Sequence, residues 1–328
     1  MIKAVDDLVL STFGGKVHPD VCIVAVAIVA LTVLRYLVAG YDGQKEPLCP
    51  PLFNILIDKS NVAKPKKTYK LAESLWYLCW HVTSLACTIC LLAHEYGTHA
   101  EPKWLSYFLK DHKGMWFIYE SVSDVGHEIS WPNISMADGV RMLNLISMGF
   151  WMSCCLYIHW ETRRSDIQIL RFHHFTTVIL ILLNYTYRFH RIGLLIIILH
   201  DIPDVLLFTT KCLSYLRLVP DLVTGAVFLI YGTSHFVCRL VLLGAFVARP
   251  LFFNIGSPEI YEFAKKYMYS LPGGVLCICL LTILTVGWRR FASQRSQVMN
   301  IYWLNLIVSM IRKFASGAEI SKCGHAAA

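Results

Sequence analysis

The stretch RRSDIQILRFHHFTTVILILLNYTYRFHRIGLLIIILHDIPDVLLFTTKCLSY, from Arg163 to Tyr215, decides the fold. It contains two long apolar runs, and each run carries ionisable side chains. A helix needs about 20 mostly apolar residues to cross the hydrocarbon core of a membrane. Phe172–Tyr187 and Ile192–Leu213 are close to that length. The stretch therefore predicts two neighbouring transmembrane helices joined by a short turn.

Apolar runs of the same kind recur along the whole chain. Hydrophobic residues make up 56% of the 328 residues and charged residues only 16%, whereas a soluble domain has about 25% charged residues. We therefore predict an all-α, polytopic membrane protein of about seven transmembrane helices. The predicted spans are Val21–Ala39, Leu71–Ala93, Val140–Trp160, Phe172–Tyr187, Ile192–Leu213, Leu222–Val247 and Tyr267–Trp288. An eighth run, Val298–Ile311, is short, so eight crossings stay open.

The charges of the connecting segments predict how the chain is oriented. Six lysines precede the second span and three arginines follow the third, whereas the segment between these two spans is rich in Asp and Glu. Because basic segments stay in the cytosol, we expect the acidic segment and the N-terminus to be lumenal. A glycosylation acceptor sequence at Asn133 agrees with this. The N-terminus lacks the basic region of a cleavable signal peptide, so the first span is expected to remain as an anchor.

Neither the net charge nor the cysteines indicate another class of protein. The charge of +8 comes from short basic segments between apolar runs, which fits membrane orientation and phosphate contact and does not indicate a nucleic-acid partner. Most of the twelve cysteines lie within apolar runs, and no paired CxxC motif occurs. We interpret them as small, buried, reduced side chains.

Ionisable side chains are concentrated in two neighbouring predicted spans. His173 and His174 lie in the fourth span, and His200, Asp201 and Asp204 lie in the fifth. Such residues are costly within a membrane, which makes them candidates for function. Helical spacing places His200 and Asp204, and also Asp201 and Asp204, on one face. A polar clamp between helices is the structural alternative.

These two groups are expected at similar depth. If the fourth helix begins near Ser165 or Asp166, His173 lies about 10 Å along it. Asp204 lies about 13 Å from the cytosolic end of the fifth helix. Antiparallel neighbours would therefore allow direct contact between His173 and Asp204. Pro203 removes a backbone donor between the acids and favours a bent helix, with or without a catalytic purpose.

The opening stretch resembles the signature of ceramide synthases, within the wider TLC-domain family. The matching positions follow one another without a gap: Asp166, His173, His174, Thr177, Tyr185, Arg191, Gly193, His200, Asp201, Asp204, Leu207, Lys211 and Tyr215. Looser matches extend over much of the chain: Glu73 to Trp76, Arg239, Ile301 to Trp303, Met310 and Lys313. The chain departs from the family pattern at Ile169, Arg188, Phe208 and Asn300, where the family usually has an acidic residue, Asn, Glu and His.

The resemblance implies a fold and a location. It implies a TLC-type helical bundle with an internal cavity over residues 71–316, in the membrane of the endoplasmic reticulum. Residues 1–70 would form an anchor helix and a basic cytosolic linker, and residues 317–328 a short tail. The acyl chain of the substrate is expected in a cavity lined by the fourth to seventh spans.

The resemblance also implies an activity, which is the transfer of a fatty acyl group from acyl-CoA to the amine of a sphingoid base. The product is a ceramide or dihydroceramide, and no cofactor or metal is expected. Histidine suits this chemistry because its pKa, about 6.5, lies near working pH, and a carboxylate beside it stabilises the imidazolium. We therefore take His173, supported by Asp204, as the reactive group. His174, His200 and Asp201 would orient groups or bind the base.

The route of the reaction stays open, and the residues that bind CoA are predicted from their charge alone. The resemblance favours an acyl intermediate on His173, and direct attack by the amine is the alternative. The phosphates of CoA cannot enter lipid, so they should bind at the cytosolic mouth. The candidate substrate-binding residues are Arg163, Arg164, Arg171, Arg191, Lys211, Arg217 and Arg239. Each basic residue alone is also explained as a charge that sets orientation.

Two other functions stay open. A membrane metal-dependent lipid-modifying enzyme would use histidine boxes, and the remaining histidines, such as His81 and His235, lack that spacing. A single His and Asp metal site is the remaining variant. A non-catalytic TLC protein that binds or transports lipid would commonly lack the complete paired-His and HDxxD set. Acyl length, the preferred base, and assembly into homo- or hetero-oligomers in contact with membrane lipids are left undecided.

Overall fold

The computed structural model describes residues 19–39, 65–97, 120–121, 128–129, 136–159, 167–186, 188–216 and 219–248, with 262, 265, 305, 307–309 and 311–312. The long helices are α2 (Pro19–Ala39), α4 (Pro65–Gly97), α7 (Asp138–Tyr157), α8 (Ile167–Thr186), α9 (His190–Leu216) and α10 (Asp221–Phe236). The last helix continues as two π-helical segments, η1 (Val237–Leu242) and η2 (Gly244–Ala248). Two-residue strands, β1 (Glu120–Ser121) and β2 (Glu128–Ile129), pair antiparallel.

Six of these helical segments are long and apolar enough to cross a membrane. They are Pro19–Val38, Lys70–His94, Asp138–Tyr157, Ile167–Thr186, His190–Leu216 and Asp221–Val247. The prediction of a helical, polytopic membrane protein is therefore confirmed, with one small strand pair outside the spans. The six correspond to the first six predicted spans. The predicted span Tyr267–Trp288 lies outside the described residues, and only a few residues of Val298–Ile311 are described.

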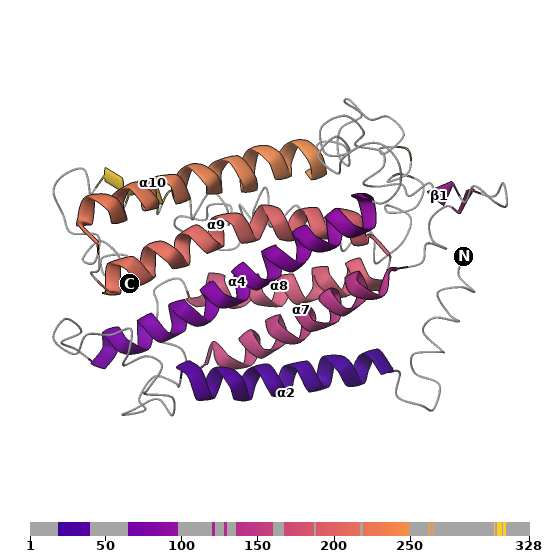
Figure 1. The fold of residues 1–328 in the computed structure, drawn as a ribbon, viewed down its shortest axis with the longest axis horizontal. Helices are drawn as coiled ribbons and strands as arrows, with labels where there is room; N and C mark the ends of the chain where they lie inside the picture. Colours follow the sequence, from indigo (N-terminus) through magenta and orange to yellow (C-terminus); the bar gives the residue numbers. More distant parts are fainter. Residues whose placement is uncertain are drawn as a thin grey trace.

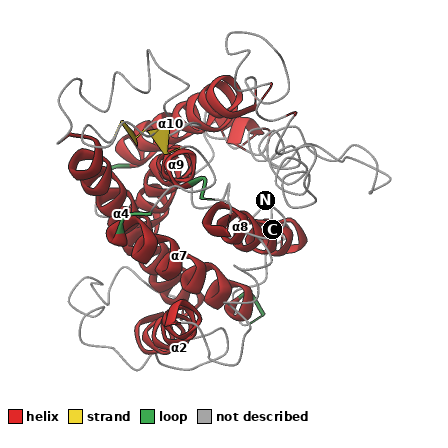
Figure 2. Cartoon of the chain, turned by 90° about the vertical axis from the view of Figure 1, so that its right-hand side faces the viewer, coloured by secondary structure: helices red, strands yellow, loops and turns green. Residues whose placement is uncertain are grey.

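The helices run side by side along the long axis of the molecule (Figure 1). Seen end-on, α2, α7, α4, α9 and α10 follow one another in a curved row, and α8 lies on one side of that row (Figure 2). α4 packs on α9, α2 and α8 pack on α7, and α10 packs on α9. Helices that are consecutive in sequence are therefore not always neighbours in space.

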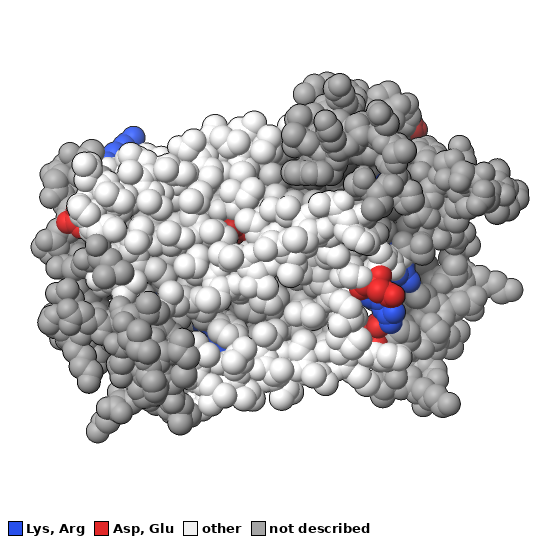
Figure 3. Space-filling model, viewed as in Figure 1, with Lys and Arg blue, Asp and Glu red and all other residues white. Residues whose placement is uncertain are grey.

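The outer surface suits lipid. The broad face in Figure 3 shows very few charged side chains along the middle of the described helices. Large apolar residues of α2 are exposed, among them Val26, Val29 and Val33. Because lipid tails are as apolar as these side chains, such exposure is expected within a membrane.

The cysteines correct one of our interpretations. All cysteines in the described part of the chain are free. Cys154, Cys212 and Cys238 are buried, as predicted, but Cys22, Cys79, Cys87 and Cys90 are exposed. The latter group lies on α2 and α4, and a small apolar side chain on a lipid-facing surface needs no protein packing. An apolar run does not by itself distinguish the two environments.

Aromatic packing holds α4 and α7 together beside the site. The rings of Trp80 and Phe150 stack with centroids 3.7 Å apart and an angle of 2° between their planes. Phe150 also meets Tyr77 edge to face at 6.3 Å. Leu71 and Phe150 are fully buried in this cluster, which Cys212 of α9 joins. These contacts fix the side of α4 that faces α9.

Two polar contacts attach α2 to the bundle, one near each of its ends. At the start of α2, Asp20 accepts hydrogen bonds from the Tyr185 hydroxyl and from Arg141, whose Nε lies 3.1 Å from Asp20 Oδ1. Near the other end, the Arg35 guanidinium lies 4.4 Å from the centre of the Tyr157 ring and donates to the Tyr77 hydroxyl at 3.3 Å. α2 is therefore held by α4, α7 and α8.

Candidate functional site

A cavity of about 130 Å³ lies between α4, α7, α8 and α9. One water needs about 10–15 Å³ by this measure, so the space is roughly ten times larger than a single-water site. The described residues that line it are Trp80, Ser84, Asn144, Ser147, Trp151, His173, Thr177, Leu180, Ile181, Asn184, Phe189, Ile192, Gly193, Ile196, Ile197, His200, Asp201 and Asp204. Four of the five predicted catalytic residues are among them.

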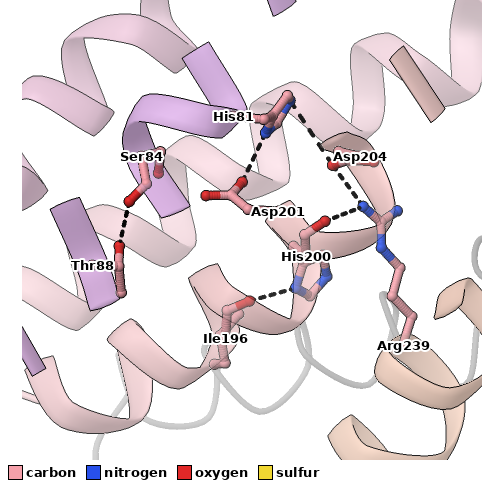
Figure 4. A network of polar contacts seen from close by, with 8 residues as sticks. All are labelled: His81, Ser84, Thr88, Ile196, His200, Asp201, Asp204 and Arg239. Atoms are coloured by element: carbon pink, nitrogen blue, oxygen red, sulfur yellow. Dashed lines mark hydrogen bonds and ion pairs between the residues drawn. The ribbon is translucent and has the colours of Figure 1, made fainter. Parts of the chain in front are cut away.

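A network of charged side chains crosses the wall of this cavity (Figure 4). His81 of α4 contacts both acids of α9, with 2.7 Å from its Nδ1 to Asp201 Oδ1 and 3.9 Å from its Nε2 to Asp204 Oδ2. Arg239 of η1 approaches Asp204 from the other side, with 2.6 Å between Nη2 and Oδ2. The same guanidinium donates to the backbone carbonyl of His200 at 3.0 Å. Three membrane helices therefore meet at the two carboxylates.

Burial makes this network electrostatically important. His81 is 2% exposed, and Asp201 and Arg239 are each 5% exposed. An isolated charge in such surroundings is strongly unfavourable, and a paired and hydrogen-bonded charge is tolerated. The two carboxylates lie against one guanidinium and one imidazole, so opposite charges are available on both sides of Asp204. Removing one partner would leave the other charge buried.

Local helix geometry brings these residues together. Asp201 and Asp204 lie on either side of Pro203, whose ring nitrogen cannot donate to the carbonyl of Leu199. α9 nevertheless continues through the proline to Leu216. On the facing element, η1 begins two residues before Arg239. π-helical turns are rare and occur frequently at functional sites, and here the turn carries the residue that binds Asp204.

Trp151 of α7 lies among three histidines. Its ring centroid is 6.0 Å from that of His173, 5.3 Å from that of His174 and 6.2 Å from that of His81. The ring of His173 meets Trp151 edge to face, at an angle of 88°. His173 lines the cavity, and His174 is buried with 3% of its surface exposed. The indole therefore limits how the His173 imidazole can turn.

The structure places His173, His200, Asp201 and Asp204 in the lining of one cavity. The described lining comes from the second to fifth spans, whereas the sequence predicted a cavity lined by the fourth to seventh. The structure also gives Asp204 two partners, His81 and Arg239, that differ from the expected one. His200 is held by its own helix, because its Nδ1 lies 2.8 Å from the carbonyl oxygen of Ile196. The catalytic assignments themselves stay predictions.

The predicted substrate-binding residues do not form one group. Arg163, Arg164 and Arg217 lie outside the described residues. Arg171 is near the start of α8, 3.4 Å from His159, and Lys211 lies over the Phe208 ring near the end of α9. Arg191 is at the start of α9 and therefore at the opposite end of the bundle. Arg239 belongs to the buried network.

His81 is the residue that sequence reasoning missed. His81 fits no histidine box, but it is an ionisable residue within an apolar span, which is the feature that makes the other site residues candidates. Its ring stacks on Phe208, with centroids 5.6 Å apart and 10° between the planes. Tyr77 stacks on the same Phe208 at 5.1 Å. The departure from the family pattern at Phe208 thus lies directly beside His81.

No group of three or more His, Cys, Asp or Glu side chains within the described residues is arranged to hold a metal ion.

Comparison with known proteins identifies the family of this chain. The TLC domain matches residues 70–309, which is well over half of the chain. The chain belongs to the TLC-domain family.

Several ceramide synthases are similar to this TLC-domain protein. It is 26% identical to ceramide synthase 4 of Bos taurus over 266 residues, which cover 80% of this chain and 56% of the bovine protein. It is 27% identical to ceramide synthase LOH2 of Arabidopsis thaliana over 256 residues, or 78% and 73% of the two chains. ASC1-like protein 3 of Oryza sativa subsp. japonica is 25% identical over 273 residues. The match thus spans little more than half of the bovine relative.

Proposed function

We propose that this TLC-domain protein is a ceramide synthase, an N-acyltransferase that joins a fatty acyl group from acyl-CoA to a sphingoid base. The observation that carries the proposal is that His173 and the two acids of α9 line one cavity between four membrane helices. The names of the similar proteins support the same activity. A cavity within the membrane also suits two substrates that are both largely hydrocarbon.

The reaction exchanges one acyl bond for another. In the covalent route, the unprotonated nitrogen of His173 attacks the thioester carbon, the carbon–sulfur bond breaks, and CoA leaves as a thiol after taking up a proton. The neutral amine of the base then attacks the acyl-imidazole, the bond to His173 breaks, and the amine loses one proton as the amide forms. Direct attack by the amine, with His173 as general base, gives the same products.

The surrounding residues would position these groups. Trp151 packs against the His173 ring and would hold it toward the thioester carbon. Asp204 would stabilise positive charge that develops on His173, while Arg239 and His81 keep that carboxylate in place. Asp201, His200 and His174 would bind the ammonium and hydroxyl groups of the base or orient their neighbours. Each of these roles requires a protected, water-poor site, and the burial of the network supports this.

CoA would remain at the end of the bundle where α8 begins and α9 ends. Arg171 and Lys211 lie at this end and could contact its phosphates. We propose that this end faces the cytosol, that the N-terminus is lumenal, and that the protein resides in the endoplasmic reticulum. Cysteine probes introduced at Lys66 and Ser165 should then react with an impermeant reagent in sealed microsomes, and a probe at Ser135 should not.

Purified protein in detergent, supplied with mixed acyl-CoAs and sphinganine, should form N-acyl products detectable by mass spectrometry. His173→Ala should reduce this activity at least about a thousandfold, because the reacting imidazole is lost. His94→Ala is the control, because His94 is an exposed histidine near the end of α4, and it should leave the activity unchanged. A protein that extracts lipid but forms no amide would instead be a binding or transport protein.

The covalent route has its own test. Incubation with acyl-CoA alone, followed by rapid quenching at mildly alkaline pH, should add one acyl mass to a peptide that contains His173. Release of CoA without this adduct, or an adduct on another residue, would favour direct attack by the amine.

A further inference from the structure

The lining of the cavity changes with depth, and its far end contains polar as well as apolar side chains. Near one end are His173, His200, Asp201 and Asp204. The wall then becomes aliphatic, with Leu180, Ile181, Ile196 and Ile197, and Ile192 and Phe189 lie beyond them at the level of Gly193. The opposite end contains two asparagines, Asn144 of α7 and Asn184 of α8, with Ser147 one turn nearer the histidines. A site for a plain hydrocarbon chain would have no need of this third zone.

The two asparagines connect α7 to α8 at this end of the cavity. Asn184 Nδ2 donates to Asn144 Oδ1 at 2.9 Å, and Asn144 Nδ2 donates to the carbonyl of Val140 in its own helix at 2.9 Å. α9 approaches this pair closely, because a Cβ atom on Gly193 would lie 2.5 Å from the amide of Asn184. Only glycine fits there without a shift. We refer to Asn144 and Asn184 as the amide floor.

Part of the hydrogen-bonding capacity at this end is not used by the described part of the chain. Asn184 Oδ1 and Ser147 Oγ are both buried, and neither has a hydrogen-bond partner among the residues that the structure describes. Ser147 is 97% buried, with 3% of its surface exposed. Buried polar atoms are nearly always hydrogen-bonded, so two unsatisfied ones at the same end of a cavity call for a ligand group. One is an acceptor, and the other both donates and accepts, which together match a hydroxyl group.

The distance from the reacting histidine restricts which hydroxyl this is. Asn184 lies about 16 Å beyond His173 along the axis of α8, at about 1.5 Å per residue. The hydroxyls of a sphingoid base are close to its amine, and the amine must be at the histidines for the reaction. They cannot also reach the amide floor. An acyl chain held at His173 by its carbonyl can reach it through the aliphatic zone.

We propose that the amide floor recognises an oxygen at the far end of the acyl chain, so that the preferred donor is an ω-hydroxyacyl-CoA. An extended chain advances about 1.3 Å per carbon–carbon bond of about 1.5 Å, which gives roughly 12 to 14 carbons between His173 and the floor. This inference rests on the proposed N-acyltransferase activity. It adds the class of acyl donor and the residues that select it.

The test compares matched acyl donors in the purified protein. Saturated acyl-CoAs from decanoyl to octadecanoyl, and their ω-hydroxy counterparts, are each supplied with sphinganine, and kcat/KM is measured. Near the predicted length, the hydroxylated donor should be used about fivefold to tenfold better than the methyl-ended one, which is the value of one or two hydrogen bonds. Saturated donors much longer than this should be used poorly.

Two variants locate the effect. Asn184→Leu should abolish the preference for the hydroxylated donor, read as the ratio of kcat/KM for the two donors within each variant, and Ser147→Ala should reduce this ratio. Ser153→Ala is the matched control, because Ser153 is a buried serine of the same helix whose hydroxyl already bonds the carbonyl of Phe150. It should leave the ratio unchanged. If Asn184→Leu fails to fold, comparison of Ser147→Ala with Ser153→Ala still tests the proposal, because only the first should lower the preference for the hydroxylated donor.

The outcomes separate the two proposals. N-acylation with equal use of hydroxylated and methyl-ended donors would overturn the recognition of a chain-end oxygen and leave the proposed function intact. A preference that survives both Asn184→Leu and Ser147→Ala would remove the amide floor as its cause. Absence of N-acylation with every donor in the unmodified protein would overturn the proposed function, and the inference with it.

Discussion

Among the described residues, the acid–arginine pairs Asp204–Arg239 and Asp20–Arg141 differ in their surroundings. Asp204 and Arg239 lie in the middle of the bundle beside a cavity, and the arginine side chain is only 5% exposed. Asp20 and Arg141 lie where α2 and α7 begin, and the arginine side chain is 35% exposed. The first pair also joins a histidine and a second acid, whereas the second pair joins a tyrosine. We therefore interpret Asp204–Arg239 as part of a candidate reaction centre and Asp20–Arg141 as a structural contact between α2 and α7.

Among tests of this contrast, the largest effect is expected when the charge of Asp204 is removed. Asp204→Asn keeps the size of the side chain but leaves Arg239 buried without its carboxylate partner. We expect kcat to fall by at least about a hundredfold, because the charge that stabilises the imidazolium is lost. Asp204→Glu keeps the charge and should lose less. Both are measured as N-acylation of sphinganine, with folding checked by size-exclusion chromatography.

Equal losses in the two Asp204 variants would mean that geometry rather than charge governs this position. Asp20→Asn serves as the control, since it removes the same charge from the other acid–arginine pair. If it impaired turnover as strongly as Asp204→Asn, the distinction between the two pairs would be wrong.

A smaller effect is expected from His81, which touches both acids without being one of the predicted reacting groups. His81→Gln retains one donor but cannot reach two carboxylates in the same way as the imidazole ring. We expect kcat to fall about tenfold to a hundredfold with KM for both substrates nearly unchanged, as for a misplaced catalytic group. His81→Ala should lose more. A raised KM with normal kcat would show that His81 contacts substrate instead.

The smallest effect on activity is expected from the tie at the start of α2. Asp20→Asn should leave kcat within about twofold and lower the midpoint of thermal unfolding by a few degrees, because a partly exposed ion pair contributes modestly to stability. The midpoint is measured by heating the detergent-solubilised protein and quantifying the soluble fraction. An unchanged midpoint would show that the Tyr185 hydrogen bond alone suffices.

The features that the sequence could predict are those that depend on local sequence alone. Helical spans follow from runs of apolar residues, and the paired His173 and His174 with the acids of α9 stand out within such runs. α8 and α9 are consecutive and antiparallel, so their similar depth could be estimated by counting residues. Both predictions needed only local information.

The missed parts depend on contacts between distant segments. His81 meets Asp201 only because α4 packs on α9 across the row of helices. Arg239 was recognised as a position, but its approach to Asp204 depends on the π-helical turn of η1. The amide floor likewise joins α7 to α8 through one hydrogen bond. Asparagine and serine within an apolar run carry no pattern that identifies their partners.

The attachment of α2 has a practical consequence for anyone who expresses fragments of this protein. The family match begins at residue 70, after α2 has ended, so a fragment cut at that point would seem complete. Yet such a fragment would lose the acid that binds Arg141 and Tyr185 and the guanidinium that packs on Tyr77 and Tyr157. A charged side chain and three tyrosine surfaces would then face lipid. The region that matches the family is therefore smaller than the unit that we expect to fold stably, and α2 belongs to that unit.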